Sequence, residues 1–170
     1  MKAQIWSFDF AVSVIFFITI ITVLIFAWNY TNTQSIRQLQ FNEIEITALT
    51  ASDSLIRIPG LPKNWNETNV DVIGLAKSCD NGCENMLNDS KTVQFVNLTN
   101  YDYQMVRSLL TDKYHFYFEM RYLNNTVIED AGISLAAGNS PPSNASIVVP
   151  VERYVLYKEK MAKLSLIVWI

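Results

Sequence analysis

The chain has 170 residues, a length that suits one modest domain with an extended element and argues against a multidomain enzyme. Only 17% of its residues are charged, and the formal net charge is -3 with a sequence pI near 5.1. A nucleic-acid binder needs a basic surface that neutralises phosphates, so this composition excludes that class of protein.

Residues 10–28 contain no charged side chain. As a helix they cross a hydrocarbon core of about 30 Å, whereas a cleavable secretory signal has a shorter apolar region followed by small residues. Leu24 stands where such a signal needs a small residue before Ala27. Lys2 precedes the run and the next basic residue is Arg37, which predicts a cytoplasmic N-terminus and an external remainder.

No proline or glycine precedes the Pro59-Gly60 pair, so we expect one helix over residues 4–58, about 80 Å long, with an amphipathic part from residue 29. One apolar set follows helical spacing at Phe41, Ile44, Ala48, Ala51, Leu55 and Ile58. A second, sparser set comprises Leu39, Ile46, Leu49 and Ile56, interrupted by Asp53 and Arg57. A surface helix on a soluble domain explains the first set alone. Two sets favour one face for the head domain and another for neighbouring subunits.

Residues 59–170 are predicted to form a β-rich extracellular head, so the fold class is α+β with a small antiparallel sheet packed against the long helix. Strands are expected at residues 70–76 and 114–122, the latter from alternating aromatic side chains, and two more at residues 146–170 joined by a turn at residues 158–160. Pro150 indicates an edge or the start of a strand.

One short helix is expected in the middle of the head. The segment 99–113 has helical spacing, and Thr99 or Asn100 is the candidate N-cap.

The N-terminal stretch "KAQIWSFDF" resembles the leader of archaeal type IV pilin-like proteins, in which a basic residue and a small residue precede glutamine and an apolar run. "GLPKNW" and the late Trp169 are further, weaker points of similarity. The resemblance implies that a prepilin peptidase cuts between Ala3 and Gln4, removes residues 1–3 and leaves the apolar helix on the mature chain. That helix is then an anchor in the membrane and later the core of a polymer.

The resemblance also implies a role for Asp9. Cleavage creates an α-ammonium group on Gln4, and both charges become buried on assembly. Five residues along a helix correspond to about 140° around its axis, so Asp9 is placed to meet the amine of a neighbouring subunit rather than its own. The alternative is that Asp9 lies in the lipid headgroup layer.

The two cysteines, Cys79 and Cys83, enclose three residues in a turn-rich segment. On the outer side of a membrane a disulfide between them is favoured, because metal binding needs two further ligands and a redox site is more typically C-x-x-C. The lone histidine, His115, lies within a strand pattern with no accompanying nucleophile. We therefore expect no catalytic residue, metal site or cofactor.

Six N-x-[ST] motifs occur, which favours a secreted, glycosylated surface. Asn29 adjoins the membrane segment and is too close to it to be reached, so it is not a candidate glycosylation site. The candidate glycosylation sites are Asn66, Asn88, Asn97, Asn124 and Asn144.

The expected function is that of a structural subunit of an extracellular type IV pilus-like filament for adhesion or surface interaction, not that of an enzyme. Its expected partners are other copies of itself, the membrane before assembly, the prepilin peptidase and the assembly machinery. Two alternatives are a single-pass anchored binding module and a minor pilin that primes assembly.

Overall fold

The structure is a computed structural model that describes the backbone of residues 2–78 and 85–170, with side chains from residue 8 onward. The chain divides into two compact units, Met1–Asn42 and Glu43–Ile170. The second unit is the head.

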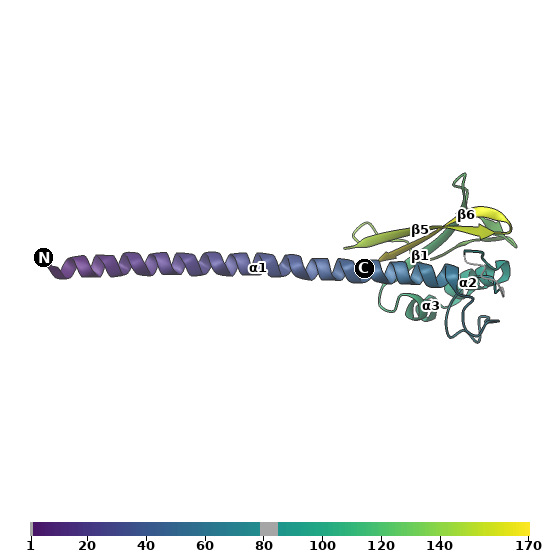
Figure 1. Cartoon of the computed structure of the whole chain (residues 1–170), viewed down its shortest axis with the longest axis horizontal. Coiled ribbons are helices and arrows are strands. Elements are labelled where there is room, and N and C mark those ends of the chain that lie inside the picture. The colour runs from purple at the N-terminus through teal and green to yellow at the C-terminus, as the bar shows by residue number, and fades with distance from the viewer. Residues whose placement is uncertain (1, 79–84) are drawn as a thin grey trace. The chain divides into compact units, whose positions relative to one another are not determined.

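Helix α1 (Lys2–Arg57) is continuous (Figure 1). It begins two residues before the expected start and ends one residue before the expected end. Its length follows from the absence of proline and glycine up to Pro59, because these are the residues that break helices. Its last part, from Glu43 onward, belongs to the head.

The head contains a four-stranded antiparallel sheet in the order β4-β1-β6-β5 (Figure 1). Its strands are β1 (His115–Tyr122), β4 (Ala136–Gly138), β5 (Val148–Tyr157) and β6 (Lys160–Trp169), and a separate two-stranded ribbon joins β2 (Glu129–Asp130) and β3 (Ile133–Ser134). This confirms the α+β class and the C-terminal hairpin. Pro150 lies on the edge strand β5, where its missing N–H costs no ladder bond.

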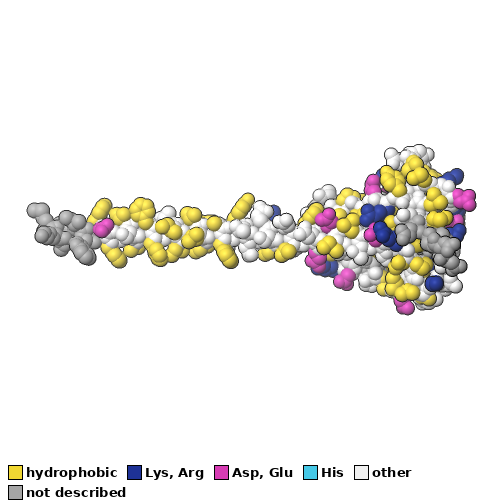
Figure 2. Space-filling view, viewed as in Figure 1, with side chains coloured by type: hydrophobic (Ala, Val, Ile, Leu, Met, Phe, Trp, Pro, Cys, Tyr) yellow, Lys and Arg dark blue, Asp and Glu magenta, His cyan; other side chains and the backbone are white. Residues whose placement is uncertain are grey.

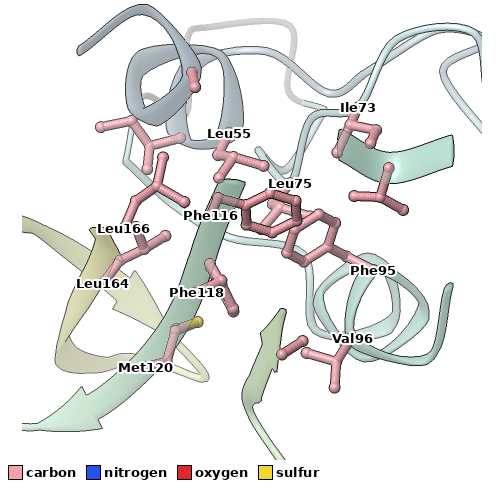
Figure 3. Close-up of a cluster of buried hydrophobic side chains, with 14 of the residues drawn as sticks. Leu55, Ile73, Leu75, Phe95, Val96, Phe116, Phe118, Met120, Leu164 and Leu166 are labelled. Atoms are coloured by element: carbon pink, nitrogen blue, oxygen red, sulfur yellow. The ribbon is translucent and has the colours of Figure 1, made fainter. Parts of the chain in front are cut away.

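The core lies between this sheet, the last part of α1 and helix α2 (Asp89–Tyr101) (Figure 3). Alternate residues of β1 point inward, so Phe116 and Phe118 are fully buried, and Phe95 of α2 meets the Phe118 ring edge-on at 5.0 Å between ring centres. The inward face of α1 contributes side chains at helical spacing. They are Ile44, Ala48, Ala51 and Leu55, each 3% exposed or less.

The expected strand at residues 70–76 is absent from the described residues, where this segment forms only isolated bridges. The reason is that its amides bind the end of α1. The N–H of Leu75 donates to Leu55 O (2.8 Å) and the N–H of Ala76 donates to Ile58 O (3.1 Å). The last carbonyls of a helix have no partner within it, so this segment satisfies them instead of joining a sheet.

The prediction of Thr99 or Asn100 as an N-cap is also wrong. Thr99 lies inside α2, which the sequence pattern did not reveal, and its hydroxyl donates to Phe95 O. The helix that follows, α3 (Tyr103–Leu110), has Asp102 as its N-cap, whose carboxylate accepts from Met105 N at 3.0 Å. Two short helices therefore replace the single expected one.

The loop after α1 is closed by Trp65, which is 2% exposed and donates its indole N–H to Gly74 O (2.9 Å) and Pro59 O (3.1 Å). Gly60 has φ +81°, and a Cβ at this position would lie 2.5 Å from the Trp65 ring. Glycine is therefore required both for its backbone conformation and for space.

Candidate membrane and assembly segment

The apolar part of α1 leaves its side chains uncovered within the chain. Between Phe8 and Trp28 the large hydrophobic side chains other than Val12 are 37% to 75% exposed. The four consecutive residues 15–18 are all exposed, and consecutive residues point about 100° apart, so the helix is apolar on every side. Figure 2 shows these hydrophobic side chains along the helix. Such a segment needs lipid or other apolar helices around it.

The hydroxyl groups of this segment are satisfied within the helix. Ser13 donates to Asp9 O, Thr19 to Ile15 O and Thr22 to Ile18 O, at 2.8 to 2.9 Å. No water is needed to satisfy these donors, which suits an apolar environment. By length and composition, α1 is able to cross a membrane, and no other helix in the described residues meets that criterion.

Asp9 is the acidic residue next to this run, and its side chain is exposed. Ala3 and Gln4 lie in α1, but their side chains are outside the described ones, so the cleavage site and the charge pair of Asp9 with the Gln4 amine remain predictions.

The second apolar set on α1 is only partly as expected. Leu39, Ile46 and Leu49 are 68%, 64% and 39% exposed, whereas Ile56 is 3% exposed and belongs to the core. From the first set, Phe41 and Ile58 are exposed instead of buried. Of these two sets, Leu39, Phe41, Ile46 and Leu49 therefore remain exposed on α1 for a contact outside the chain.

The interrupting charges have defined partners. Asp53 accepts from Arg153 of β5 at 3.2 Å and lies 3.9 Å from Arg57. Arg153 occupies an inward position of its strand, so this pair links α1 to the sheet inside the head. Asp53 therefore helps to hold the last part of α1 against β5.

The head has a groove of about 370 Å³ between the last part of α1 and the segment at the end of α3. Ile46 and Leu109 contribute exposed apolar surface to it, and an ion pair between Glu43 and Lys113 (2.5 Å) lies on its wall. The hydrogen bond from Lys113 holds the pKa of Glu43 below its ordinary value. Ile46, from the exposed apolar set, therefore lines the groove.

His115 lies in an aromatic stack and is half-buried. Its ring lies 4.5 Å from the Trp169 ring and 6.0 Å from the Tyr103 ring, and Nδ1 is 3.1 Å from the Tyr103 hydroxyl. Nε2 is 3.5 Å from Arg107, which can only donate, so this contact requires a neutral imidazole. Burial, with the charge of Arg107, lowers the pKa of His115. The stack gives the histidine a structural role at the end of the sheet.

The glycosylation candidates occupy different settings. Asn66, Asn124 and Asn144 are exposed in turns. Asn88 is the N-cap of α2 and Asn97 lies within that helix. Cys79 and Cys83 are outside the described residues, so their disulfide remains a prediction.

Sequence reasoning missed a buried charged group in the head. Lys91 of α2 is 7% exposed, and its ammonium donates to Pro59 O (2.5 Å) and Lys63 O (2.7 Å). Burial lowers its pKa. Lysine after an N-cap is commonplace, so no sequence signal distinguishes this one.

No protein-family model, curated protein or solved structure matches this chain. The architectural class of this chain therefore follows from its structure. A long N-terminal apolar helix, with its last part packed on an antiparallel sheet, is a pilin-like architecture.

Proposed function

We propose that this chain is a structural subunit of an extracellular type IV pilus-like filament, assembled by packing of its N-terminal helices and used for adhesion or surface interaction. The observation that carries the proposal is the apolar segment of α1, which is exposed on all sides and continues without a break into a helix that is part of the head core. In this proposal the chain has no enzymatic role.

An apolar segment alone would also serve as a simple anchor. The polymer is favoured by Leu39, Ile46 and Leu49, which remain exposed on α1 beyond the residues that a membrane would cover. A simple anchor has no need of an apolar face there, whereas neighbouring subunits would bury it. In this proposal the chain is inserted with its N-terminus in the cytoplasm, cut between Ala3 and Gln4, and then moved from lipid into the filament.

An anchored binding module is the second candidate. The groove between α1 and the end of α3 favours it, because a concave surface with apolar and polar lining suits a ligand. A minor pilin that primes assembly would share the helix and the leader with the principal subunit.

The substitution Asp9→Ala separates a filament subunit from an anchor. Removing a charge makes the segment more apolar, so membrane insertion is expected to be maintained. In a filament the same change leaves the Gln4 α-ammonium of a neighbour without its partner, and breaking one side of a buried pair costs about 3 to 5 kcal/mol. We therefore expect normal amounts of inserted protein and a strong loss of filaments.

The measurement is electron microscopy of material sheared from the native cells, with the membrane fraction assayed in parallel. Asp71→Ala is the matched control, because it removes the same charge from an exposed position in the head. Normal filament yield from the Asp9→Ala strain would contradict the charge pair. Absence of filaments in the unsubstituted strain would favour the anchored module.

A further inference from the structure

Two of the five candidate glycosylation motifs share one hydrogen-bond arrangement. Asn66 Oδ1 accepts from the backbone N–H of Thr68 (3.0 Å) and from its hydroxyl (2.7 Å). Asn124 Oδ1 accepts from the backbone N–H of Thr126 (3.1 Å) and from its hydroxyl (2.7 Å). All four side chains are exposed. The two motifs lie in separate loops. The shared arrangement therefore arises from the N-x-T motif itself, where the backbone is not held in a helix.

Both turns are held in place by the rest of the head. Asn66 follows the buried Trp65, and its own N–H donates to Asn69 Oδ1 at 2.7 Å. Asn124 lies in a turn at the end of β1, where the N–H of Tyr122 donates to Thr126 O at 2.9 Å. Each carboxamide is therefore presented on a fixed, solvent-facing turn.

The arrangement bears on the reactivity of the amide. The nitrogen of a carboxamide is a poor nucleophile, because its lone pair is delocalised into the carbonyl. Two donors on Oδ1 stabilise the negative charge that this oxygen gains when Nδ2 gives up a proton, and hydrogen bonds to a charged acceptor are the stronger ones. The Thr hydroxyl and N–H therefore favour the anionic form of the amide, in which nitrogen can attack.

The other three motifs differ in this respect. Asn97 lies within α2. Thr99 is 2% exposed, and its hydroxyl donates to Phe95 O at 2.7 Å. Asn88 uses Oδ1 to accept from Lys91 N at 3.1 Å, as the N-cap of the same helix.

Asn144 is exposed, but the N–H two residues later, on Ser146, donates to Ile170 O at 2.8 Å. This N–H is therefore engaged with the C-terminal residue rather than with the carboxamide.

We propose that Asn66 and Asn124 are the N-glycosylation sites of the folded head, and that Asn88, Asn97 and Asn144 are not modified. The donor is an oligosaccharide carried on a lipid phosphate. Asn Nδ2 forms a bond to the anomeric carbon of the sugar, and the bond from that carbon to the phosphate oxygen breaks. The phosphate leaves with the bonding electron pair, and a base of the transferase takes the Nδ2 proton. No oxidant or reductant takes part.

The test is glycopeptide mass spectrometry of the full chain isolated from its native cells, read at all five motifs. The expected result is a saccharide on Asn66 and on Asn124 and none on the other three. A chain without any N-linked saccharide would overturn the proposal, as would a saccharide on only one of the two assigned sites. Modification of Asn97 or Asn88 would show that transfer precedes folding, and this too would overturn it, as would modification of Asn144.

Matched variants test the hydroxyl. Thr126→Ala removes one of the two donors to Asn124 Oδ1, whereas Thr126→Ser keeps a hydroxyl, and residue 126 is exposed, so both variants are expected to fold. The loss of one glycan mass in the Ala variant and its retention in the Ser variant support the assignment. Retention of the glycan in the Ala variant contradicts it. These readouts do not depend on filament formation, because membrane-bound protein serves equally well.

Discussion

The buried face of α1 within the head predicts how the substitution Leu55→Ala changes the stability of the head. Leu55 is fully buried, and Figure 3 shows it directed toward Phe116 of β1 in the core. Leucine and alanine are both good helix formers, so the helix itself is little affected and the change acts through lost packing. Removing a fully buried leucine side chain costs about 2 to 5 kcal/mol, and we expect about 3 kcal/mol here, because the cavity would be lined by regular strands that cannot readily collapse.

Leu49→Ala is the matched control, since Leu49 is the same residue type on the same helix but is 39% exposed. Its truncation removes much less buried area, so the expected loss in the free energy of unfolding is below about 1 kcal/mol. Since about 1 kcal/mol shifts the melting temperature of a domain of this size by roughly 3 to 5 °C, Leu55→Ala should melt about 10 °C lower than the unsubstituted protein.

The assay is thermal unfolding of the full chain in detergent micelles, followed by near-ultraviolet circular dichroism. It reports the environment of the aromatic residues in the core. Equal shifts for the two variants would refute the idea that one face of α1 is a structural part of the head, and so would an unchanged melting temperature for Leu55→Ala.

Two further predictions concern the head. Cys79 and Cys83 are expected to be oxidised to each other, so alkylation of the unreduced protein should label neither residue, and labelling of both thiols would contradict this. The pKa of His115 is lowered from its ordinary value of 6.5, so the stability that the neutral ring contributes is complete above that pH and is lost as the pH falls below it. The difference in free energy of unfolding between the unsubstituted protein and His115→Phe should therefore shrink on acidification, and a difference that grows at low pH would refute the assignment of a neutral ring.

Alternation and helical spacing predict the parts of this fold in which one face is apolar and the other is not. Strand β1 follows from its alternating aromatic residues, and the buried face of α1 follows from the spacing of Ile44, Ala48, Ala51 and Leu55. Periodicity does not say where an apolar face ends. Spacing alone therefore places Ile56 on the outer face, although the neighbouring residues Leu55 and Ile56 are both buried in the head.

Helix α2 shows why the rest could not be predicted. Half of its six buried residues, Lys91, Thr92 and Thr99, are polar, so no apolar stripe marks it. Their burial depends on partners elsewhere in the fold, such as Pro59 O for Lys91. The N-x-[ST] motifs can be recognised in the sequence. The hydrogen bonds that distinguish Asn66 from Asn97, however, exist only in the folded chain.

We propose above that this chain polymerises through α1 after losing its leader. The most direct test is mass spectrometry of intact subunits from filaments that have been sheared from native cells and seen by electron microscopy. We expect filaments built from this chain, with Gln4 as the first residue and the whole apolar segment retained. Filaments that lack this chain, or a chain that begins at Met1 and is found only in the membrane fraction, would contradict it.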